Sequence, residues 1–301
     1  ETLKEKNIRY VPVKYLNGID LKRIVRIEQP DIIHAHDFTA SIICAVSAQK
    51  IPVISHIHNN CPWLKKICLK TLAYGMTCFK YKYMLGVSDS VFEEFIFGRF
   101  FDKKEKIVGN PISVELIRRK TDGSNSGEEY DIAFLGRLSE QKNPLKYIEI
   151  INDIQCEMPV KAVMIGDGEL REIVEEKIQE LGLEEIINLK GFLENPYEIL
   201  QKCKVLCMPS RWEGFGLAAV EALALGVPVV ATEVGGLPGI IDESCGKLCD
   251  SKETFVEEIG SLLSDSELYR KKISGANKRA EELVREMDQE VEAIAQATGA
   301  R

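Results

Sequence analysis

Short apolar runs alternate with helix-forming runs along almost the whole chain, and this alternation restricts the fold more than any other feature. In the first part we expect strands at 8–13, 31–35, 52–57, 83–87 and 106–109. Helical patterns lie between them, at 20–28, 39–48, 63–79 and 90–100. An alternation of this kind predicts a parallel sheet that is covered by helices on both faces.

A polar segment interrupts the alternation once. Residues 120–129 read KTDGSNSGEE, without any apolar side chain, which is typical of a linker. The pattern then restarts, with strands expected at 130–136, 161–165, 187–190, 204–209 and 228–232 and helices at 144–153, 169–181, 197–202 and 217–225. The tail from residue 251 has a charged helical pattern.

The alternation and its interruption predict the domain organisation. We expect a Rossmann-like domain at 1–120, a linker at 121–129, a second Rossmann-like domain at 130–280, and a C-terminal helix at 281–301 that packs back on the first domain. Doubly wound sheets bind ligands at the carboxyl ends of their strands, so two such domains are expected to face each other across a ligand-binding cleft.

Charge and cysteine content exclude several classes of protein. The net charge is −8, which disfavours non-specific nucleic-acid binding, although residues 1–120 carry 20 Lys and Arg against 12 Asp and Glu. The longest run without a charged side chain has 14 residues (51–64), too few for the ~20 that a membrane span needs. Nine cysteines, an odd number with no secretory leader before them, indicate reduced thiols in a cytoplasm. Their spacing fits a zinc site poorly.

Two glutamates flank a glycine turn between an expected strand and a helix. Glu213 precedes Gly214-Phe215-Gly216, and Glu221 lies one turn into the helix that follows. Glycines and a helix N-terminus present N–H groups to an anion, so a phosphate fits this turn. Carboxylates suit the hydroxyls of a sugar and of a ribose, because a charged acceptor makes the stronger hydrogen bonds. A chance pair of glutamates in a Glu-rich chain is the alternative.

Two cations follow another expected strand. Arg137 and Lys142 lie in FLGRLSEQKN, beyond the strand end at Gly136, where they are able to neutralise a diphosphate. The alternative is a solvated loop. The chain has no Asp-x-Asp pair, so we expect neither a bound metal nor a cofactor here.

The four histidines form two His-x-His pairs at the ends of expected strands, His34 with His36 and His56 with His58. Alternation along a strand puts both members of a pair on one face. A substrate-facing role, buried structural histidines and metal ligation are all open. Zinc would need a third ligand beyond one pair.

Taken together, these motifs resemble the retaining glycosyltransferases of family 4, which have the GT-B fold. Glu213 and Glu221 match the E-x7-E signature of that family, and Gly136-Arg137-Leu138 with Lys142 matches its diphosphate-binding residues. The turns at Gly166-Asp167-Gly168, Gly191-Phe192, Pro209-Ser210 and Gly235-Gly236-Leu237-Pro238 also match, and HAHD and HIHNN resemble strand ends of polysaccharide-building members.

The resemblance implies a hexosyltransferase that moves a sugar from a UDP- or GDP-linked donor to a glycan or lipid-linked acceptor, with retention and without a metal. Arg137 and Lys142 would neutralise the diphosphate, Glu221 would bind the ribose, and Glu213 would bind donor-sugar hydroxyls. The amides of Phe215, Gly216 and Leu217 would lie near phosphate or sugar, as would Gly214. Phe192 would contact the base through its backbone, and His58 would lie near the anomeric centre.

Two departures from the family pattern accompany the resemblance. Gly239 stands where the family often has Glu. Family members also begin with a strand and a glycine-rich loop that this sequence lacks, so we expect a native polypeptide longer by about 50–60 residues, or two strand–helix units.

Two other functions remain open. Gly214–Ala219 also fits the dinucleotide fingerprint G-x-G-x-x-A, with Glu233 as the ribose-binding acid, which would indicate an NAD-dependent oxidoreductase. A nucleotide-sugar-binding protein without turnover is the second alternative.

Residues 60–88 combine five lysines with aromatic side chains and contain no Asp or Glu. Leu64, Cys68, Leu72 and Met76 recur every four residues, as on an amphipathic helix. Such a helix is able to lie on an anionic membrane, which predicts a cytoplasmic protein held peripherally at the inner face. The alternative is that the apolar stripe packs on the sheet.

Overall fold

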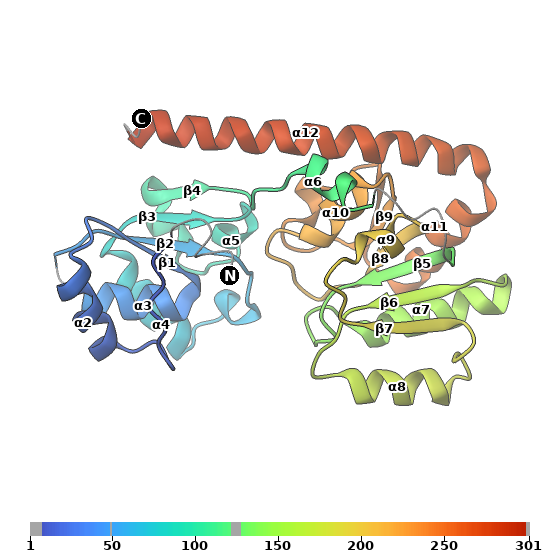
Figure 1. Ribbon diagram of the computed structural model, residues 1–301, viewed down its shortest axis with the longest axis horizontal. Helices are drawn as coiled ribbons and strands as arrows, with labels where there is room; N and C mark the ends of the chain where they lie inside the picture. Colours follow the sequence, from blue (N-terminus) through green and yellow to red (C-terminus); the bar gives the residue numbers. More distant parts are fainter. Residues whose placement is uncertain (1–7, 49, 122–127, 299–301) are drawn as a thin grey trace. The chain divides into compact units, whose positions relative to one another are not determined.

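The computed structural model describes residues 8–48, 50–121 and 128–298 and divides into two compact units (Figure 1). The first unit comprises Glu1–His58, Pro62–Gly86 and Phe92–Lys106, and the second comprises the remainder of the chain. Residues 107–120 therefore group with the second unit. Residues 122–127 of the expected linker lie outside the described ranges.

The first unit is built on a four-stranded sheet with the order β1-β2-β3-β4, in which β1, β2 and β3 pair in parallel. Its elements, with α5 and β4 at the boundary of the division, are α2 (Gly18–Glu28), β1 (Ile33–His36), α3 (Asp37–Ser47), β2 (Val53–Ile57), η1 (Pro62–Lys65), α4 (Leu69–Cys78), β3 (Tyr81–Gly86), α5 (Ser90–Glu93), η2 (Gly98–Phe100), η3 (Asp102–Lys104) and β4 (Glu105–Ile107). The parallel sheet with flanking helices is confirmed for this unit.

Three expectations for the first unit are wrong in detail. Residues 8–13 form no strand, because a strand needs a partner and β1 pairs only with β2 in the described residues. The helix expected at 63–79 is broken, since Cys68 is extended and starts α4 as its N-cap, with Thr71 Oγ1 accepting from the Cys68 N–H at 2.8 Å. The helix expected at 90–100 is reduced to α5 and η2.

The second unit is built on a six-stranded sheet with the order β10-β9-β8-β5-β6-β7, and its pairings are parallel. Its elements are α6 (Val114–Arg119), β5 (Tyr130–Leu135), α7 (Pro144–Glu157), β6 (Ala162–Ile165), α8 (Arg171–Glu180), β7 (Ile187–Gly191), α9 (Tyr197–Leu200), β8 (Cys203–Met208), α10 (Leu217–Ala224), β9 (Val229–Thr232), η4 (Leu237–Gly239), β10 (Gly246–Cys249), α11 (Lys252–Ser264) and α12 (Ser266–Thr298). This is the strand order of doubly wound nucleotide-binding sheets.

The core of the second unit lies on both faces of its sheet. Ile132 and Phe134 of β5 pack with α7, α8 and α11, whereas Ala133 packs with α6, α9, α10 and α12 on the opposite face. In Figure 1, α12 runs above the strands of this sheet and α8 lies below them. Because strand side chains alternate, each central strand contributes to both clusters, which explains its continuous apolar sequence.

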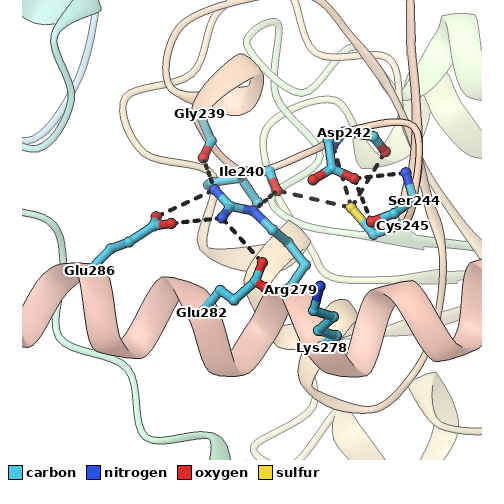
Figure 2. Close-up of polar contacts among 9 residues, drawn as sticks. All are labelled: Gly239, Ile240, Asp242, Ser244, Cys245, Lys278, Arg279, Glu282 and Glu286. Atoms are coloured by element: carbon cyan, nitrogen blue, oxygen red, sulfur yellow. Dashed lines mark hydrogen bonds and ion pairs between the residues drawn. The ribbon is translucent and has the colours of Figure 1, made fainter.

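The C-terminal helical tail contains α11 and one long helix, α12, which begins at Ser266. Arg279 fixes α12 to the end of η4, because its guanidinium donates to the Gly239 carbonyl at 2.6 Å and to the Ile240 carbonyl at 3.1 Å (Figure 2). Glu286 accepts from the same guanidinium at 2.9 Å. The expectation that residues 281–301 pack back on the first domain remains a prediction.

Within the described ranges, no helix combines the length and the hydropathy that a crossing of the bilayer requires.

Candidate functional site

Most of the expected site residues lie at the carboxyl ends of β5 and β8 in the second unit. These two strands are neighbours, and β5 is the point where the strand order reverses. Ligands of open α/β sheets bind outside the carboxyl ends of the strands at such a switch point. The loop after β5 carries Arg137 and Lys142, and the loop after β8 carries Glu213.

The loop after β5 is held by the glycine turn after β6. A Cβ on Gly166, which has φ +141°, would lie 1.9 Å from the Gly136 carbonyl oxygen. A Cβ on Gly168 would lie 2.4 Å from the Leu138 carbonyl oxygen, and the Leu138 N–H donates to the Asp167 carbonyl at 3.0 Å. The Gly166-Asp167-Gly168 motif therefore positions the loop that carries Arg137.

Lys142 and Glu213 form an ion pair between the two loops. The Glu213 side chain is 5% exposed and that of Lys142 is 19% exposed, so the pair is largely removed from water. Ser210 Oγ also donates to Glu213 Oε1 at 2.9 Å. Gln141 joins the same loops, since its Nε2 donates to the Trp212 carbonyl at 3.1 Å. Glu213 is thus a fixed, buried carboxylate with a cation beside it.

The turn before α10 is packed against the Gly235-Gly236 turn. Gly216 is the N-cap of α10 with φ +105°, a backbone conformation that favours glycine. A Cβ on Gly236 would lie 2.7 Å from the carbonyl oxygens of Gly214 and Phe215. The two glycine-containing turns are therefore in direct backbone contact. Glu213 precedes the first of these turns, and α10 begins directly after it.

Glu221 lies on α10 and accepts from Tyr197 Oη of α9 at 2.9 Å. Burial raises the pKa of Glu221, while the Tyr197 hydrogen bond and the positive charges of Lys142 and Lys120 oppose that rise. The pKa of Tyr197 is raised by burial and by the Glu221 charge. Lys142 thus acts electrostatically on both carboxylates, through a direct pair with Glu213 and through space with Glu221.

Three expected residues have exposed side chains. Arg137 lies beyond β5, Leu217 is at the first position of α10, and Phe192 follows β7 with its side chain 78% exposed. They lie at the carboxyl-end side of the sheet. Leu217 is four residues before Glu221 on α10, and within the described residues no hydrogen bond or ion pair joins the three side chains to the carboxylates of Glu213 or Glu221. Their roles remain predictions.

The four histidines lie together in the first unit. His34 Nε2 lies 3.2 Å from His56 Nδ1, and His36 Nδ1 lies 2.7 Å from His58 Nε2. The His58 backbone N–H donates to Asp37 Oδ1 at 3.2 Å. Burial lowers the pKa of His34, and the nearby charges of His36 and His58 lower it further. Asp37 has φ +66°, a strained backbone conformation of the kind that is often found at functional sites.

Sequence reasoning missed three members of the site, Ser210, Tyr197 and Lys120. Ser210 was part of a noted turn, but nothing in its position indicated a bond to Glu213. Tyr197 starts a short helix 24 residues before Glu221, so no local spacing connects the two. Lys120 Nζ lies 5.5 Å from the centre of the Tyr197 ring, and Lys120 is the first residue of the polar segment at the expected domain boundary.

The geometry argues against the dinucleotide alternative. That fingerprint follows the first strand of a doubly wound sheet. Here Gly214–Ala219 follows β8, the fourth strand of this sheet in chain order, and Glu213 beside it is paired with Lys142.

Two family models match consecutive parts of the chain. Residues 5–116 match Glycosyltransferase Family 4, and residues 117–279 match Glycosyl transferases group 1. Among relatives, an uncharacterized glycosyltransferase of Methanocaldococcus jannaschii is 27% identical over 76% of this chain and 62% of its own length. The chain thus spans less than two thirds of that relative.

A second relative is the Campylobacter jejuni enzyme named GalNAc-alpha-(1->4)-GalNAc-alpha-(1->3)-diNAcBac-PP-undecaprenol alpha-1,4-N-acetyl-D-galactosaminyltransferase. It is 28% identical over 87% of this chain and 73% of its own length. Among solved structures, Anabaena Alr3699/HepE in complex with UDP has a TM-score of 0.81 at 19% identity, covering 98% of this chain and 88% of that one. This likeness shows the fold.

The family model matches more than half of the chain, and both units have the parallel α/β sheets of the GT-B fold. The chain therefore belongs to the glycosyl transferases group 1 family.

Proposed function

We propose that this chain is a retaining glycosyltransferase that moves a sugar from a nucleotide-sugar donor to a glycan or lipid-linked acceptor. The observation that carries the proposal is the buried set of Glu213, Lys142 and Ser210 beside Glu221 in the second unit, at the switch point of its sheet. A cation and two carboxylates at such a point suit a ligand that carries both phosphates and hydroxyls.

Each donor group is assigned to residues of the second unit. Lys142 and Arg137 neutralise the diphosphate, and the amides of Phe215, Gly216 and Leu217 at the start of α10 add hydrogen bonds to phosphate or sugar. Glu221 binds the ribose hydroxyls, and Glu213 binds hydroxyls of the donor sugar. The Phe192 backbone contacts the base.

Retention is proposed to follow a front-face route without a metal. The bond between the anomeric carbon and the diphosphate oxygen breaks, and the bond to the acceptor oxygen forms on the same face. The acceptor proton passes to the leaving phosphate, whose charge Lys142 and Arg137 stabilise. The proposal gives His58 a place near the anomeric centre. An NMR time course should show a product with the donor's anomeric configuration, and an inverted product would refute this route.

Known proteins suggest the substrates. The Anabaena neighbour has structures with UDP and with UDP-glucose, so a UDP-linked hexose or N-acetylhexosamine is our first candidate donor. The name of the Campylobacter relative gives an undecaprenol-linked acceptor. We therefore propose a lipid-linked saccharide as the acceptor, and synthesis of a cell-surface polysaccharide on the cytoplasmic side of the membrane as the role.

An exposed apolar surface on α4 supports peripheral membrane association. Leu64 is fully buried in η1, so the expected stripe is wrong at that position, but Leu72 is 43% and Met76 71% exposed. These two side chains line an apolar groove of about 300 Å³ together with Gly75, Phe79, Phe97, Phe100 and Phe101. The alternative that the apolar stripe packs on the sheet is therefore compatible with the buried Leu64 but not with the exposed Leu72 and Met76.

Charge around this apolar surface favours an anionic bilayer. Lys65, Lys66, Lys70, Lys80 and Lys82 are all exposed. Lys65 is paired with Glu94 at 3.2 Å. A lysine near an anionic membrane contributes about 1 kcal/mol, and the apolar side chains add burial in the headgroup region.

Vesicle co-sedimentation tests the membrane proposal. Binding should require anionic lipid, weaken at high salt, and fall when the five lysines are changed to Gln. A charge-matched control changes five exposed lysines of the second unit to Gln and should retain binding. These are Lys161, Lys190, Lys204, Lys271 and Lys278. Equal loss in both sets, or no binding at low salt, would refute it.

A donor screen tests the catalytic proposal. UDP- and GDP-linked sugars are incubated with the full-length protein and lipid-linked or free saccharide acceptors, and release of nucleoside diphosphate is measured. Acceptor-dependent release is the expected result. Donor binding without release under every acceptor would favour the alternative of a nucleotide-sugar-binding protein.

A further inference from the structure

All four histidines of the chain lie together at the carboxyl ends of β1 and β2. The two strands are parallel neighbours, and His36 pairs in register with His56. The ring centroids of neighbouring histidines in the cluster are between 4.1 and 5.4 Å apart. The sheet therefore supplies what one His-x-His pair lacks, which is a third imidazole beside the first two.

One nitrogen–nitrogen distance in the cluster matches that of a tetrahedral metal site. Zinc–nitrogen bonds of about 2.0–2.1 Å place two ligand nitrogens roughly 3.3 Å apart. His34 Nε2 and His56 Nδ1 are 3.2 Å apart. One nitrogen from each of His34, His36 and His56 lies within 4.8 Å of the other two. Ligation thus requires His36 to approach by roughly 1.5 Å at most, which a side-chain rotation on an exposed residue provides.

The third ligand also has an orienting partner. His36 Nδ1 is 2.7 Å from His58 Nε2, and the backbone of His58 is bonded to Asp37. When Nδ1 is occupied in this way, Nε2 of His36 is the nitrogen left for a metal. Metal-bound histidines ordinarily have their second ring nitrogen fixed by such a partner.

We propose that His34, His36 and His56 bind one divalent transition metal of the zinc class, with a fourth position open to water or another small ligand. An all-imidazole set suits Zn²⁺, Co²⁺, Ni²⁺ or Cu²⁺, whereas Mg²⁺ and Mn²⁺ prefer oxygen ligands. The site lies within the first unit and does not depend on the proposed donor site. The competing explanation is a network of neutral histidines joined by N–H···N bonds, which binds no metal.

The test is a Co²⁺ titration of the full chain, freed of any polyhistidine tag and followed by visible absorption, with Zn²⁺ as competitor. We expect saturation at one equivalent and an intense tetrahedral or five-coordinate spectrum without a thiolate charge-transfer band. The absence of that band separates the cluster from the nine cysteines. Nitrogen hyperfine coupling in the spectrum of a Cu²⁺-loaded sample provides the second readout.

Variants assign the ligands. Loss of a residue that only orients a ligand costs about 10- to 100-fold in metal affinity. His34→Gln and His56→Gln each remove a ligand, so each should weaken Co²⁺ binding by at least that factor. His34 is exposed, so its variant keeps the test valid if replacement of the buried His56 disturbs folding. Cys156→Ser removes an exposed thiol and should leave affinity unchanged. No saturable spectrum, unchanged affinity in His34→Gln, or loss in Cys156→Ser would each overturn the proposal.

Discussion

Glu213 is a buried carboxylate whose charge is compensated by Lys142 and by a hydrogen bond from Ser210. Burying a charge is tolerated only when such partners are present. In the proposed function, donor phosphates compete with Glu213 for the same ammonium. The carboxylate therefore holds the Lys142 ammonium in place before the donor arrives.

Loss of Lys142 should destabilise the second unit. Lys142→Ala leaves the buried Glu213 carboxylate without its cation and with the hydrogen bond from Ser210, which should reduce the free energy of unfolding by about 1–3 kcal/mol. Urea denaturation measures the change. The double variant Lys142→Ala/Glu213→Gln should recover most of the loss, because it removes the unpaired charge. A double variant that is no more stable than Lys142→Ala would contradict this explanation.

Glu105 has a pKa that is raised to about 7, chiefly by burial and further by the charge of Asp102. Its ordinary value is 4.5. At a pH between these two pKa values, Glu105 is mostly protonated in the folded chain and mostly ionised in the unfolded chain. The contribution of Glu105 to the free energy of unfolding is therefore fully present below about pH 4.5. It falls as the pH rises toward 7, and it is constant at higher pH.

Glu105→Gln should remove this pH dependence. The variant cannot ionise, so its free energy of unfolding should fall less than that of the wild type between about pH 5 and pH 8. Urea denaturation at several pH values measures the difference. Glu172→Gln, at an exposed position, should behave like the wild type. Parallel pH profiles for Glu105→Gln and wild type would disprove the assignment.

At the scale of elements, the site depends on backbone contacts between loops that follow different strands. Gly166 touches Gly136, and Gly236 touches Gly214 and Phe215. Arg279 of α12 holds the loop that follows Gly236, through the carbonyls of Gly239 and Ile240. The long C-terminal helix thereby supports the glycine turns around the proposed donor site.

Gly166→Ala should destabilise the second unit by about 3 kcal/mol or more, since its Cβ would meet the Gly136 carbonyl at a strained φ. Gly182→Ala is the matched control, because Gly182 also has a positive φ (+66°) but nothing within 4 Å of an added Cβ. The Gly182→Ala substitution should reduce the free energy of unfolding by only about 1–2 kcal/mol. Equal losses in thermal or urea denaturation would show that the loop contact is unimportant.

Element prediction succeeded where apolar periodicity was strong and failed where pairing or capping decided the outcome. All five strands expected in the second unit are present within a residue or two of their expected ends. β10 was missed because Gly246 and Lys247 give a short run little strand character. Residues 8–13 have the right composition for a strand but pair with nothing described, and Cys68 breaks a helix that periodicity alone would continue.

At the scale of the whole molecule, each of the two sheets has its own group of polar side chains at or near the carboxyl ends of its strands. The carboxylates, Lys142 and Tyr197 belong to the six-stranded sheet, and the histidines belong to the four-stranded one. Sequence order was sufficient to place Glu213, Lys142 and the histidines at strand ends. It was insufficient to pair Glu221 with Tyr197, or His34 with His56, because those contacts depend on strand order and helix packing.

Donor calorimetry tests the central claim most directly. UDP and UDP-sugars are titrated into the wild type, Glu221→Ala and Arg137→Ala, with Glu172→Gln as an exposed control. Loss of a charged hydrogen bond should weaken binding in each site variant by about 1–3 kcal/mol, or roughly 5- to 150-fold, and leave the control unchanged. Unchanged donor affinity in both Glu221→Ala and Arg137→Ala would contradict the placement of the donor at the carboxyl ends of β5 and β8.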